Sequence, residues 1–441
     1  MEKRVRFQLP QGHENPDEDL YYRPHFNKEN LISSKKLGEV IKESSSSATL
    51  HGAPPLPAES TDQGTSESIS LGLLDTISPV GIISKTTETD VFDGIYRIGR
   101  HSEVTPAMKE QLVDLLRRYR STFAADINEM SCYEGPEGDF HLQLKEGEDR
   151  CFSKPRRFNP FEMDAIKETF TKLEKCGFIR PVSGEPKACK FAANPVVAMK
   201  KDLQGTYTET RVCLDYSKLN QKLEYEASYR FETAPSLHDR VVSSGNKFFS
   251  LLDNRSAFHA IRVDEESQAL LGFWWPKENS TELYTWTRLP FGLASAPIAY
   301  SRRIVKAIEA FGLSQACLSY IDDTLIASPT WEAHLKHLEQ YFKCLNSISI
   351  RLHTDKSEFA MESVQFLGFN CSAKGLTPAA SKVIAIQSLP EPTNLKALQS
   401  ALGFFNYYRS FVKDYSMIAK PLTALTKKDK PFEWKEAQAR A

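Results

Sequence analysis

Two adjacent acidic residues, Asp322 and Asp323, stand inside an apolar, strand-forming run that extends from Leu318 to Ile326. Isolated charges are costly to bury, so a chain that keeps two of them in such a run normally supplies a compensating cation, most simply a metal ion. Because the side chains of a strand alternate between its faces, neighbouring carboxylates can reach one ion only where the backbone turns. The run therefore predicts a hairpin with both carboxylates at its turn, and an Asp-Asp surface turn is the alternative interpretation.

A third carboxylate, Asp253, ends the apolar run that begins at Phe248. Three Asp side chains on neighbouring central strands suit two hard cations, which prefer oxygen ligands and keep other positions for phosphates and water. This arrangement predicts phosphoryl transfer.

The hydrophobic pattern predicts helices and strands that follow one another along the chain. Thr105-Pro106 and Asn159-Pro160 each combine a capping residue with a first-turn proline, and predict helices that end near Phe123 and Gly177. Short β-rich runs predict strands at 192–199, 207–214, 247–252, 270–275 and 282–289. Helical spacing returns at 297–311, 331–345 and 395–411. This mixture predicts an α+β fold.

Residues 1–90 differ in composition from the rest of the 441-residue chain. They hold 9 Lys and Arg against 14 Asp and Glu, and include the serine run 44–47 and the proline-rich stretch 54–57. Such a segment buries too little apolar surface to offset chain entropy, so we expect a disordered or linker segment, with order beginning near Val91. The chain contains no Asp-Thr-Gly or Asp-Ser-Gly sequence and gives no support for an aspartic protease.

Other metal sites receive little support from the sequence. The eight cysteines include no Cys-x-x-Cys pair, which favours reduced thiols in an intracellular protein over a zinc site or a disulfide framework. His334 and His337 lie on one predicted helix, where a solvated face is a better interpretation than a metal pair.

Charge and hydropathy bear on partners and location. No signal-peptide core and no 18-residue apolar run occurs, so we expect a soluble protein without a membrane partner, in the cytoplasm or nucleus. Residues 376–441 carry 10 basic against 5 acidic residues. That excess suits contact with a phosphate backbone, and a solvated surface explains it equally well.

Several motifs occur in the order and spacing of successive reverse transcriptase motifs. They are Phe248–Phe258, Leu289–Pro297 (LPFGLASAP), Tyr320–Asp323, Leu352–Phe359 and Phe366–Gly368. The phenylalanine after Leu289-Pro290, the segment Ala401–Arg409 and the terminal Phe432-Glu433-Trp434 resemble gypsy-type LTR retrotransposons specifically. The resemblance covers roughly residues 95 to 435.

The resemblance implies a right-hand polymerase with fingers, an antiparallel palm sheet and a helical thumb, preceded by the disordered segment 1–90. A helical N-terminal extension is then expected at 91–138, fingers and palm at 139–375, and a helical thumb or connection at 376–430. Residues 431–441 would be the truncated start of an RNase H region, so no protease or RNase H activity is expected of the chain itself.

The resemblance also assigns roles to individual residues. Asp253, Asp322 and Asp323 would be the catalytic residues and would hold two Mg²⁺ ions, for which Mn²⁺ could substitute. The residues expected to bind the dNTP are Lys200, Arg211, Phe258, Phe291 and Gly292. The primer grip would be Phe366, Leu367 and Gly368, and Lys356 could protonate the leaving pyrophosphate. From the residues alone, Lys200 could equally be a solvated hairpin lysine, Lys356 a surface lysine and Phe258 a core residue.

The implied function is RNA-directed and DNA-directed DNA synthesis, with an RNA or DNA template, a DNA primer and dNTPs as partners. Ser217 and Ala260 depart from the residues usual in relatives, and the 202–211 loop looks longer than in retroviruses, which puts catalytic efficiency in question. A catalytically idle or domesticated nucleic-acid-binding remnant is the alternative from another class, and the intact Asp trio argues against it. An RNA-dependent RNA polymerase is a related alternative, which Phe258 disfavours because its ring would exclude a 2′-hydroxyl.

Overall fold

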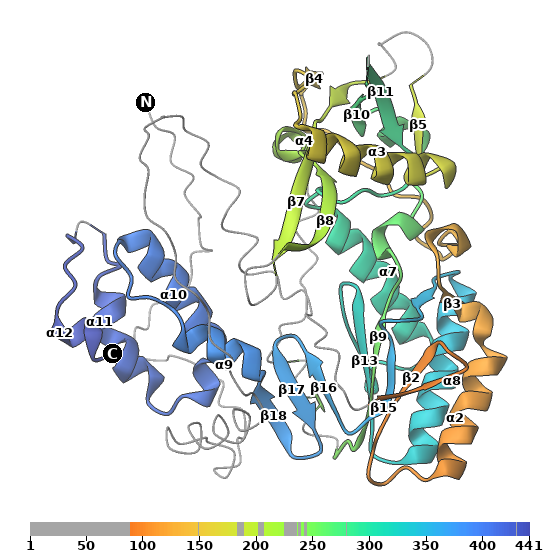
Figure 1. Ribbon diagram of the computed structural model, residues 1–441, viewed down its shortest axis with the longest axis vertical. Coiled ribbons are helices and arrows are strands. Elements are labelled where there is room, and N and C mark those ends of the chain that lie inside the picture. Colours follow the sequence, from red (N-terminus) through yellow and green to blue (C-terminus); the bar gives the residue numbers. More distant parts are fainter. Residues whose placement is uncertain are drawn as a thin grey trace, which may run out of the picture. The chain divides into compact units, whose positions relative to one another are not determined.

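The computed structural model describes residues 89–148, 150–182, 189–201, 207–224, 236, 240–241, 245–278, 280–428 and 430–441 (Figure 1). The segment expected to be disordered lies outside the described residues except for Thr89 and Asp90, which already belong to a strand. The described chain forms two compact units, 89–389 and 390–441. Among the described residues, no helix is long and apolar enough to cross a membrane.

A six-stranded sheet forms the centre of the larger unit. In spatial order its strands are β1 (Thr89–Phe92), β2 (Tyr96–Gly99), β15 (Glu358–Met361), β9 (Phe248–Asp253), β13 (Asp323–Ser328) and β12 (Cys317–Tyr320). Neighbouring strands are antiparallel except for β2 and β15, which run parallel. The two strands that carry the predicted carboxylates, β9 and β13, are therefore direct neighbours, as the palm assignment requires.

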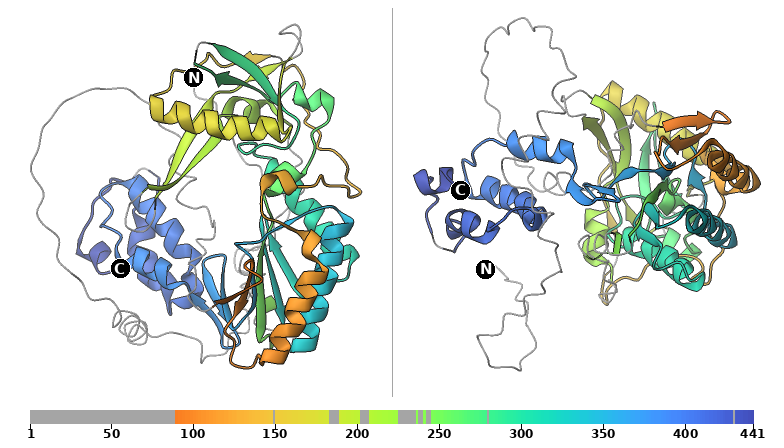
Figure 2. Two further views of the ribbon diagram at one scale, coloured as in Figure 1. Left: turned by 45° about the vertical axis from the view of Figure 1, so that its right-hand side comes forward. Right: turned by 90° about the horizontal axis from the view of Figure 1, so that it is seen from below.

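Both faces of this sheet are buried, which explains the continuous apolar runs in its central strands. On one face, Phe248, Leu252 and Ile326 join the main core beneath α2 (Pro106–Arg118), α7 (Ala296–Ala310) and α8 (Trp331–Ser347). On the other face, Phe249 and Leu325 join a second cluster that includes residues of the hairpin β16–β17. Figures 1 and 2 show α2 (orange) and α8 (cyan) side by side on the first face.

The segment 91–138 contains α2 but also half of β1 and all of β2, so the expectation of a helical extension there is wrong. Tyr96 and Ile98 point into the core with 1% and 0% exposure, whereas Arg97 between them is less buried. This short alternation pairs β2 with β15 and extends the palm sheet. The remaining elements there are η2 (Arg120–Thr122), β3 (Phe123–Ala124) and η3 (Ile127–Glu129).

The predicted fingers combine small sheets with the helix α3 (Pro160–Lys175). Asn159 accepts a hydrogen bond from the backbone amide of Glu162 at 2.9 Å, and Glu162 accepts one from the backbone amide of Asn159 at 3.0 Å. This capping box fixes where α3 begins, at the predicted capping residue Asn159. The strands of this region are β4 (Cys151–Phe152), β5 (Ile179–Pro181), β6 (Phe191–Ala192), β7 (Pro195–Lys201), β8 (Tyr207–Leu214), β10 (Gly272–Pro276) and β11 (Thr281–Trp286). Its short helices are α4 (Ser217–Lys222), η5 (Ala257–Ala260) and α6 (Glu265–Gln268).

Smaller elements complete both units. In the larger unit they are β14 (Leu352–His353), β16 (Ser363–Phe366), β17 (Phe369–Ser372), β18 (Gly375–Pro378) and α9 (Ala380–Gln387). The unit 390–441 contains α10 (Leu395–Tyr407), η6 (Arg409–Phe411), α11 (Tyr415–Ala424) and α12 (Glu436–Ala439). It has its own apolar cluster around Leu398, Leu402 and Leu422. The expected helical thumb at 376–430 is therefore divided, because its first part, with α9, belongs to the larger unit.

Candidate active site

The three residues that carry the predicted carboxylates lie at one end of the palm sheet. Asp323 begins β13 and pairs directly with Asp253, the last residue of β9. Tyr320 pairs with Asp323 across the β12–β13 hairpin, so Ile321 and Asp322 form a two-residue turn. The Asn254 amide donates a hydrogen bond to the Asp322 carbonyl at 3.0 Å, which ties this turn to the end of β9. The prediction of a hairpin that places both carboxylates at its turn agrees with this geometry.

The backbone of this turn is strained at Ile321. Its φ is 55°, in the left-handed region that β-branched residues rarely enter. A positive φ at the first of two turn residues matches the twist of a hairpin but normally calls for glycine or asparagine. Such a conformation costs on the order of 1–3 kcal/mol and persists where surrounding contacts determine it. No glycine stands at this turn, so the left-handed conformation was not predicted.

Burial and mutual repulsion make the trio electrostatically unfavourable without a cation. Burial raises the pKa of Asp253, and burial followed by repulsion from Asp253 raises the pKa of Asp322 to about 7. Burial, then repulsion from Asp253 and Asp322, raises the pKa of Asp323 to about 7 as well. Asp322 Oδ1 is buried and has no hydrogen-bond partner. An oxygen of this kind suits a hard cation, which would replace the missing donor.

The described residues do not contain a preformed metal-binding site. In these parts of the chain, no three His, Cys, Asp or Glu side chains, the trio included, are gathered closely enough to hold a metal ion. What the structure provides is the backbone register that brings the three carboxylates to one end of the sheet.

Two of the predicted cationic residues influence the trio. Lys356 is exposed, and its charge opposes the rise in pKa of all three carboxyl groups. Arg211, which pairs with Ala198 in the β7–β8 hairpin, exerts the same effect on Asp322. Lys200 pairs with Glu209 in that hairpin, and its side chain lies outside what the structure describes. Positive charge therefore faces the trio from both the fingers hairpin and the segment after β14.

Three aromatic rings form a wall beside the carboxylates. Phe258 lies on η5 with 7% exposure, and its ring centroid is 5.1 Å from that of Phe291 and 6.0 Å from that of Tyr300. Phe291 is 40% exposed and presents the open part of this wall. The Tyr300 hydroxyl is buried without a hydrogen bond, and its pKa is raised by burial and by negative charge that includes Asp322 and Asp253. The sequence did not single out Tyr300.

The loop that carries Phe291 is fixed by close packing at Gly292 and by the side-chain amide of Asn220. Gly292 has a φ of 99°, and a Cβ added to it would lie 2.6 Å from the Leu214 carbonyl oxygen, so only glycine fits. Asn220 donates to the Gly292 carbonyl at 2.9 Å and accepts from the Ala294 amide at 3.1 Å. Asn220 was missed because no local sequence pattern distinguishes it from any other helical asparagine.

The predicted primer grip is the turn between β16 and β17. Phe366 pairs with Phe369, and the two turn residues Leu367 and Gly368 have φ values of 50° and 79°. Phe366 and Leu367 are 1% and 5% exposed, so their side chains belong to the core beneath the sheet. Only the backbone at Gly368 offers the close approach that the sequence analysis assigned to this segment.

The two departures from the family pattern occupy ordinary structural positions. Ala260 is 2% exposed, and its carbonyl accepts a hydrogen bond from the Tyr133 amide at 2.8 Å. Ser217 is exposed, and its amide donates to Asp215 Oδ1 at 3.2 Å at the start of α4. Neither position disturbs the placement of the Asp trio.

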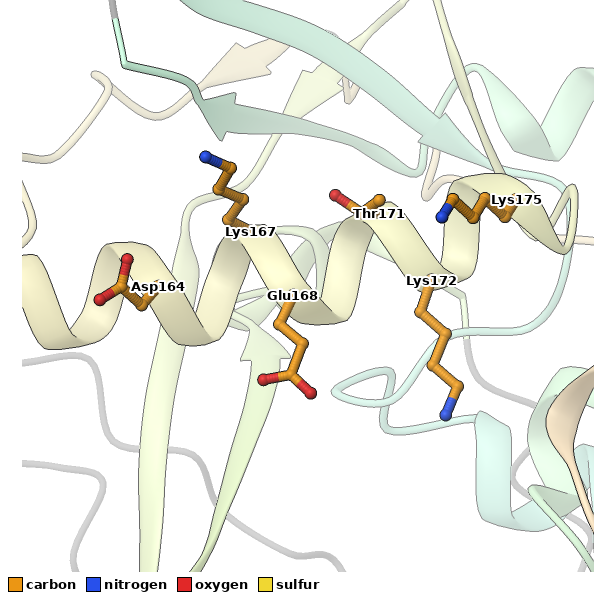
Figure 3. A pocket seen from close by; sticks show the side chains of 6 residues that line it. All are labelled: Asp164, Lys167, Glu168, Thr171, Lys172 and Lys175. Carbon is orange, nitrogen blue, oxygen red and sulfur yellow. The ribbon is translucent and has the colours of Figure 1, made fainter.

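A separate charged depression lies along α3. Figure 3 shows Lys167, Thr171 and Lys175 on one side of the helix and Glu168 and Lys172 on the other. Lys167 is paired with Glu278 at 2.8 Å and Lys172 with Asp126 at 3.8 Å. These pairs make the depression a solvated helix surface.

Comparison with known proteins agrees with this geometry. Residues 199–371 match the family model described as "Reverse transcriptase (RNA-dependent DNA polymerase)". The chain is 31% identical over 331 residues to the retrovirus-related Pol polyprotein from transposon 412 of Drosophila melanogaster, covering 74% of this chain and 25% of that protein. It is 32% identical over 291 residues to the corresponding polyprotein from transposon gypsy of the same organism, covering 63% and 27%. The chain thus spans about a quarter of the length of these curated relatives.

Solved structures show the same fold. The foamy viral protease-reverse transcriptase in complex with an RNA/DNA hybrid superposes with a TM-score of 0.62 at 23% identity, covering 86% of this chain and 46% of that one. The described chain therefore has the right-hand polymerase fold, and residues 199–371 within it match the reverse transcriptase family model. More particularly, the curated relatives that the chain resembles are retrovirus-related Pol polyproteins from transposons, in line with the resemblance of its LPFG and C-terminal motifs.

Proposed function

We propose that this protein is an RNA-directed and DNA-directed DNA polymerase that transfers a nucleotide from a dNTP to a primer 3′-hydroxyl. The observation that carries the proposal is the direct pairing of Asp253 with Asp323, with Asp322 in the adjoining turn. Carboxylates on neighbouring strands at one sheet end are the arrangement needed to place two phosphate-binding cations side by side. The reverse transcriptase family match supports the reaction class.

The chemistry of the three carboxylates suits a pair of divalent metal ions. The buried Asp322 Oδ1 without a partner and the raised pKa values of Asp322 and Asp323 both indicate carboxylates that lack compensation for their charge. When bound, two Mg²⁺ ions, or Mn²⁺ in their place, would lower the pKa of the primer hydroxyl and stabilise the charge on the triphosphate. Asp253, Asp322 and Asp323 would hold them, and the protein's contribution is the strand register that brings these three residues to one end of the sheet.

The surrounding residues would bind and orient the substrates. Arg211 and Lys200 lie on the β7–β8 hairpin, where guanidinium and ammonium groups would neutralise the triphosphate. The positive charge of Lys356 acts on the trio. Its ammonium group could donate a proton to the leaving pyrophosphate. Phe258 and Phe291 would pack against the sugar and base of the dNTP, and the Gly368 backbone would approach the primer strand.

Nucleic acid is the proposed partner. The foamy viral relative was solved with an RNA/DNA hybrid and, in another structure, with dsDNA. Residues 376–441 of this chain carry 10 basic against 5 acidic residues, which is compatible with contact with a phosphate backbone. We therefore propose that an RNA or DNA template paired with a DNA primer is bound, with dNTPs as the second substrate.

Primer extension tests the proposal directly. Purified protein should extend oligo(dT) on poly(rA) with dTTP and Mg²⁺, and EDTA should stop the reaction. Extension should also occur on poly(dA), which tests DNA-directed synthesis separately. A folded protein that binds the hybrid but extends neither template would instead identify the chain as an idle, nucleic-acid-binding remnant.

A further inference from the structure

His259 is a buried imidazole directly behind the aromatic wall of the proposed nucleotide site. It follows Phe258 on η5 and is 5% exposed. Its Nδ1 lies 3.0 Å from the carbonyl oxygen of Leu289. Because a carbonyl can only accept a hydrogen bond, Nδ1 carries the proton and donates it, which fixes the tautomer of the neutral ring.

This hydrogen bond completes one of two tethers on the loop that carries Phe291. On the first side, the Leu289 amide donates to the Ile261 carbonyl at 2.9 Å while the Leu289 carbonyl accepts from His259. On the second side, Asn220 binds the Gly292 carbonyl at 2.9 Å. Phe291 therefore lies between two fixed points, although its own side chain is 40% exposed.

The imidazole also contacts the Phe291 ring itself. The two ring centroids are 5.1 Å apart in an edge-to-face arrangement, and Phe258 packs on Phe291 at the same centroid distance. Trp286 stacks on the imidazole at 5.1 Å with an interplanar angle of 25°. The orientation of Phe291 is thus set by His259 and Phe258 together, with Trp286 supporting the imidazole.

The charge state of His259 is constant at working pH. Burial, with a smaller contribution from the positive charge of Arg288, lowers the pKa of the ring to about 4. The imidazole therefore stays neutral and keeps a single donor near neutral pH. Replacing it with another neutral residue changes hydrogen bonding and packing without changing the charge behind the site.

We propose that His259 is a positioning residue for nucleotide selection, which holds Phe291 through the hydrogen bond to Leu289 and through ring packing. This inference rests on the proposed function of the site and deepens it. Selectivity is assigned to a group that lies behind the wall and acts on the nucleotide through Phe291. Without the tether, Phe291 would move away from Phe258, and the wall that the two rings present to the sugar would open.

Two substitutions separate the hydrogen bond from the packing. His259→Phe keeps a ring of similar size but removes the Nδ1–H donor and leaves the Leu289 carbonyl unpaired. His259→Asn loses the ring but retains an amide N–H near the position of Nδ1. His334→Phe is the matched control, because His334 is also fully buried and hydrogen-bonded but lies on α8 beneath the sheet.

The kinetic test measures incorporation of dTTP and UTP per active site, with active sites counted from the burst of the first turnover. In His259→Phe we expect KM for dTTP to rise about 10-fold, the size of effect that follows when a buried acceptor loses its donor. We expect kcat to change less than about 3-fold, because the Asp trio is untouched. The preference for dTTP over UTP should fall in parallel, and His259→Asn should restore most of both values. His334→Phe should lower only the count of active sites.

A second measurement reads the position of Phe291 without relying on activity. 4-Fluorophenylalanine at position 291 gives one ¹⁹F resonance whose shift and width report how the ring is held. We expect this resonance to shift or broaden in His259→Phe, to return toward the parent in His259→Asn and to stay unchanged in His334→Phe.

The two measurements separate failure of this inference from failure of the proposed function. If the parent protein extends no primer, the proposed polymerase function is wrong, and the fluorine spectra still decide whether His259 positions Phe291. Unchanged fluorine spectra in His259→Phe would overturn the positioning role, as would equal KM and selectivity in His259→Phe and the parent. Failure of His259→Asn to recover either readout would exclude the hydrogen bond as the cause.

Discussion

At the scale of the single residue, Asp322 combines partial burial, a raised pKa and an oxygen without a hydrogen bond. A side chain kept for packing or solubility would not be held in this state, because it costs stability in the absence of a cation. Function is therefore the better explanation of its retention in an apolar hairpin.

Asp322→Asn should abolish polymerase activity while leaving the fold intact. We expect single-nucleotide incorporation to fall by about 1,000-fold or more, because a charged metal ligand is lost at the reacting phosphate. In EDTA at pH 8, the variant should unfold at a higher temperature than the parent, because repulsion within the trio is relieved. Asp114→Asn, an exposed carboxylate on α2, is the control and should change neither quantity. Parent-like incorporation by Asp322→Asn would refute the metal assignment.

Phe258 offers a test of sugar selection. Its ring is 7% exposed and contacts Phe291 and Tyr300, which fits a pocket wall and also fits a core position. A ribose 2′-hydroxyl against this ring would lose hydration without gaining a partner, which costs about 1–3 kcal/mol. Displacement of the sugar from in-line geometry would cost about another 100-fold in rate, for a total discrimination on the order of 10³.

We therefore expect Phe258→Val to gain ribonucleotide incorporation by a much larger factor than it loses deoxynucleotide incorporation. The measurement is the ratio of kcat/KM for UTP to that for dTTP on the same primer and template. Phe273→Val, at a fully buried ring in β10, is the control and should lower stability without changing this ratio. An unchanged ratio in folded Phe258→Val would assign Phe258 to the core alone.

At the scale of the element, a buried polar chain joins α8 to the palm sheet. His334 Nε2 lies 2.8 Å from Ser250 Oγ on β9, and His334 Nδ1 lies 3.0 Å from Ser328 Oγ on β13. Ser250 also accepts the Ala360 amide at 3.0 Å, at an irregularity in the pairing of β15. The expectation of a solvated face for His334 was wrong, because this face of α8 packs on the two strands that carry the carboxylates.

This histidine makes the stability of the palm depend on pH. Burial, with smaller contributions from His337 and His101, lowers the pKa of His334 to about 3, whereas the unfolded chain titrates near 6.5. As pH falls below about 6.5, the unfolded state gains a proton that the folded state does not. His334 therefore contributes a loss of stability of up to about 1.4 kcal/mol per pH unit between about pH 6 and pH 3.

His334→Phe should lower stability at pH 7, because the Ser250 and Ser328 hydroxyls lose a partner. Between pH 7 and pH 4, however, its stability should fall less steeply than that of the parent. Urea unfolding at several pH values measures both effects. Other buried histidines contribute equally to parent and variant, so the difference in slope isolates His334. Parallel slopes would show that His334 is protonated in the folded state.

Elements with strong local signals were predicted from the sequence. The capped helices α2 and α3 and the strands β9 and β13 lie close to their predicted positions, because capping residues and apolar runs act over a few residues. The predicted helix 395–411 instead ends at Tyr407 and continues as the short η6. Pairing between distant segments left weaker signals. β2 has only four residues, and its partner β15 lies far along the chain.

Within the candidate site, too, residues with a strong local signal were predicted and residues that act through distant contacts were missed. The carboxylates were predicted because charged residues in apolar runs are conspicuous. Asn220, His259 and Tyr300 were missed because each acts through a contact with a distant segment, and an asparagine, a histidine or a tyrosine is common in ordinary elements. The left-handed Ile321 was missed because the usual turn residues are absent.

At the scale of the whole molecule, the described chain has two compact units, and the proposed catalytic groups all belong to 89–389. This unit begins at β1, whose Asp90 is paired with Arg100 at 2.8 Å and with Lys109 at 2.9 Å. β2 follows and pairs with β15, which pairs in turn with β9 and its terminal Asp253. The N-terminal hairpin is thus connected to the catalytic strand through one intervening strand.

We therefore predict a sharp boundary for N-terminal truncation. A chain that begins at Thr89 should retain primer extension and thermal stability, because β1 and its ion pairs are kept. A chain that begins at Arg100 should have a free energy of unfolding that is lower by several kcal/mol, because it lacks the buried side chains of Tyr96 and Ile98. Each buried side chain of this size contributes about 1.5–3 kcal/mol. Tyr96 also packs edge-on against Phe123, with ring centroids 5.5 Å apart, so its loss loosens the contact with the neighbouring core.

Thermal unfolding and single-nucleotide incorporation of the two truncations and the full chain measure the effect. Loss of activity in the chain that begins at Thr89 would show that residues 1–88 contribute to the polymerase, and full stability in the chain that begins at Arg100 would show that β2 is dispensable to the palm.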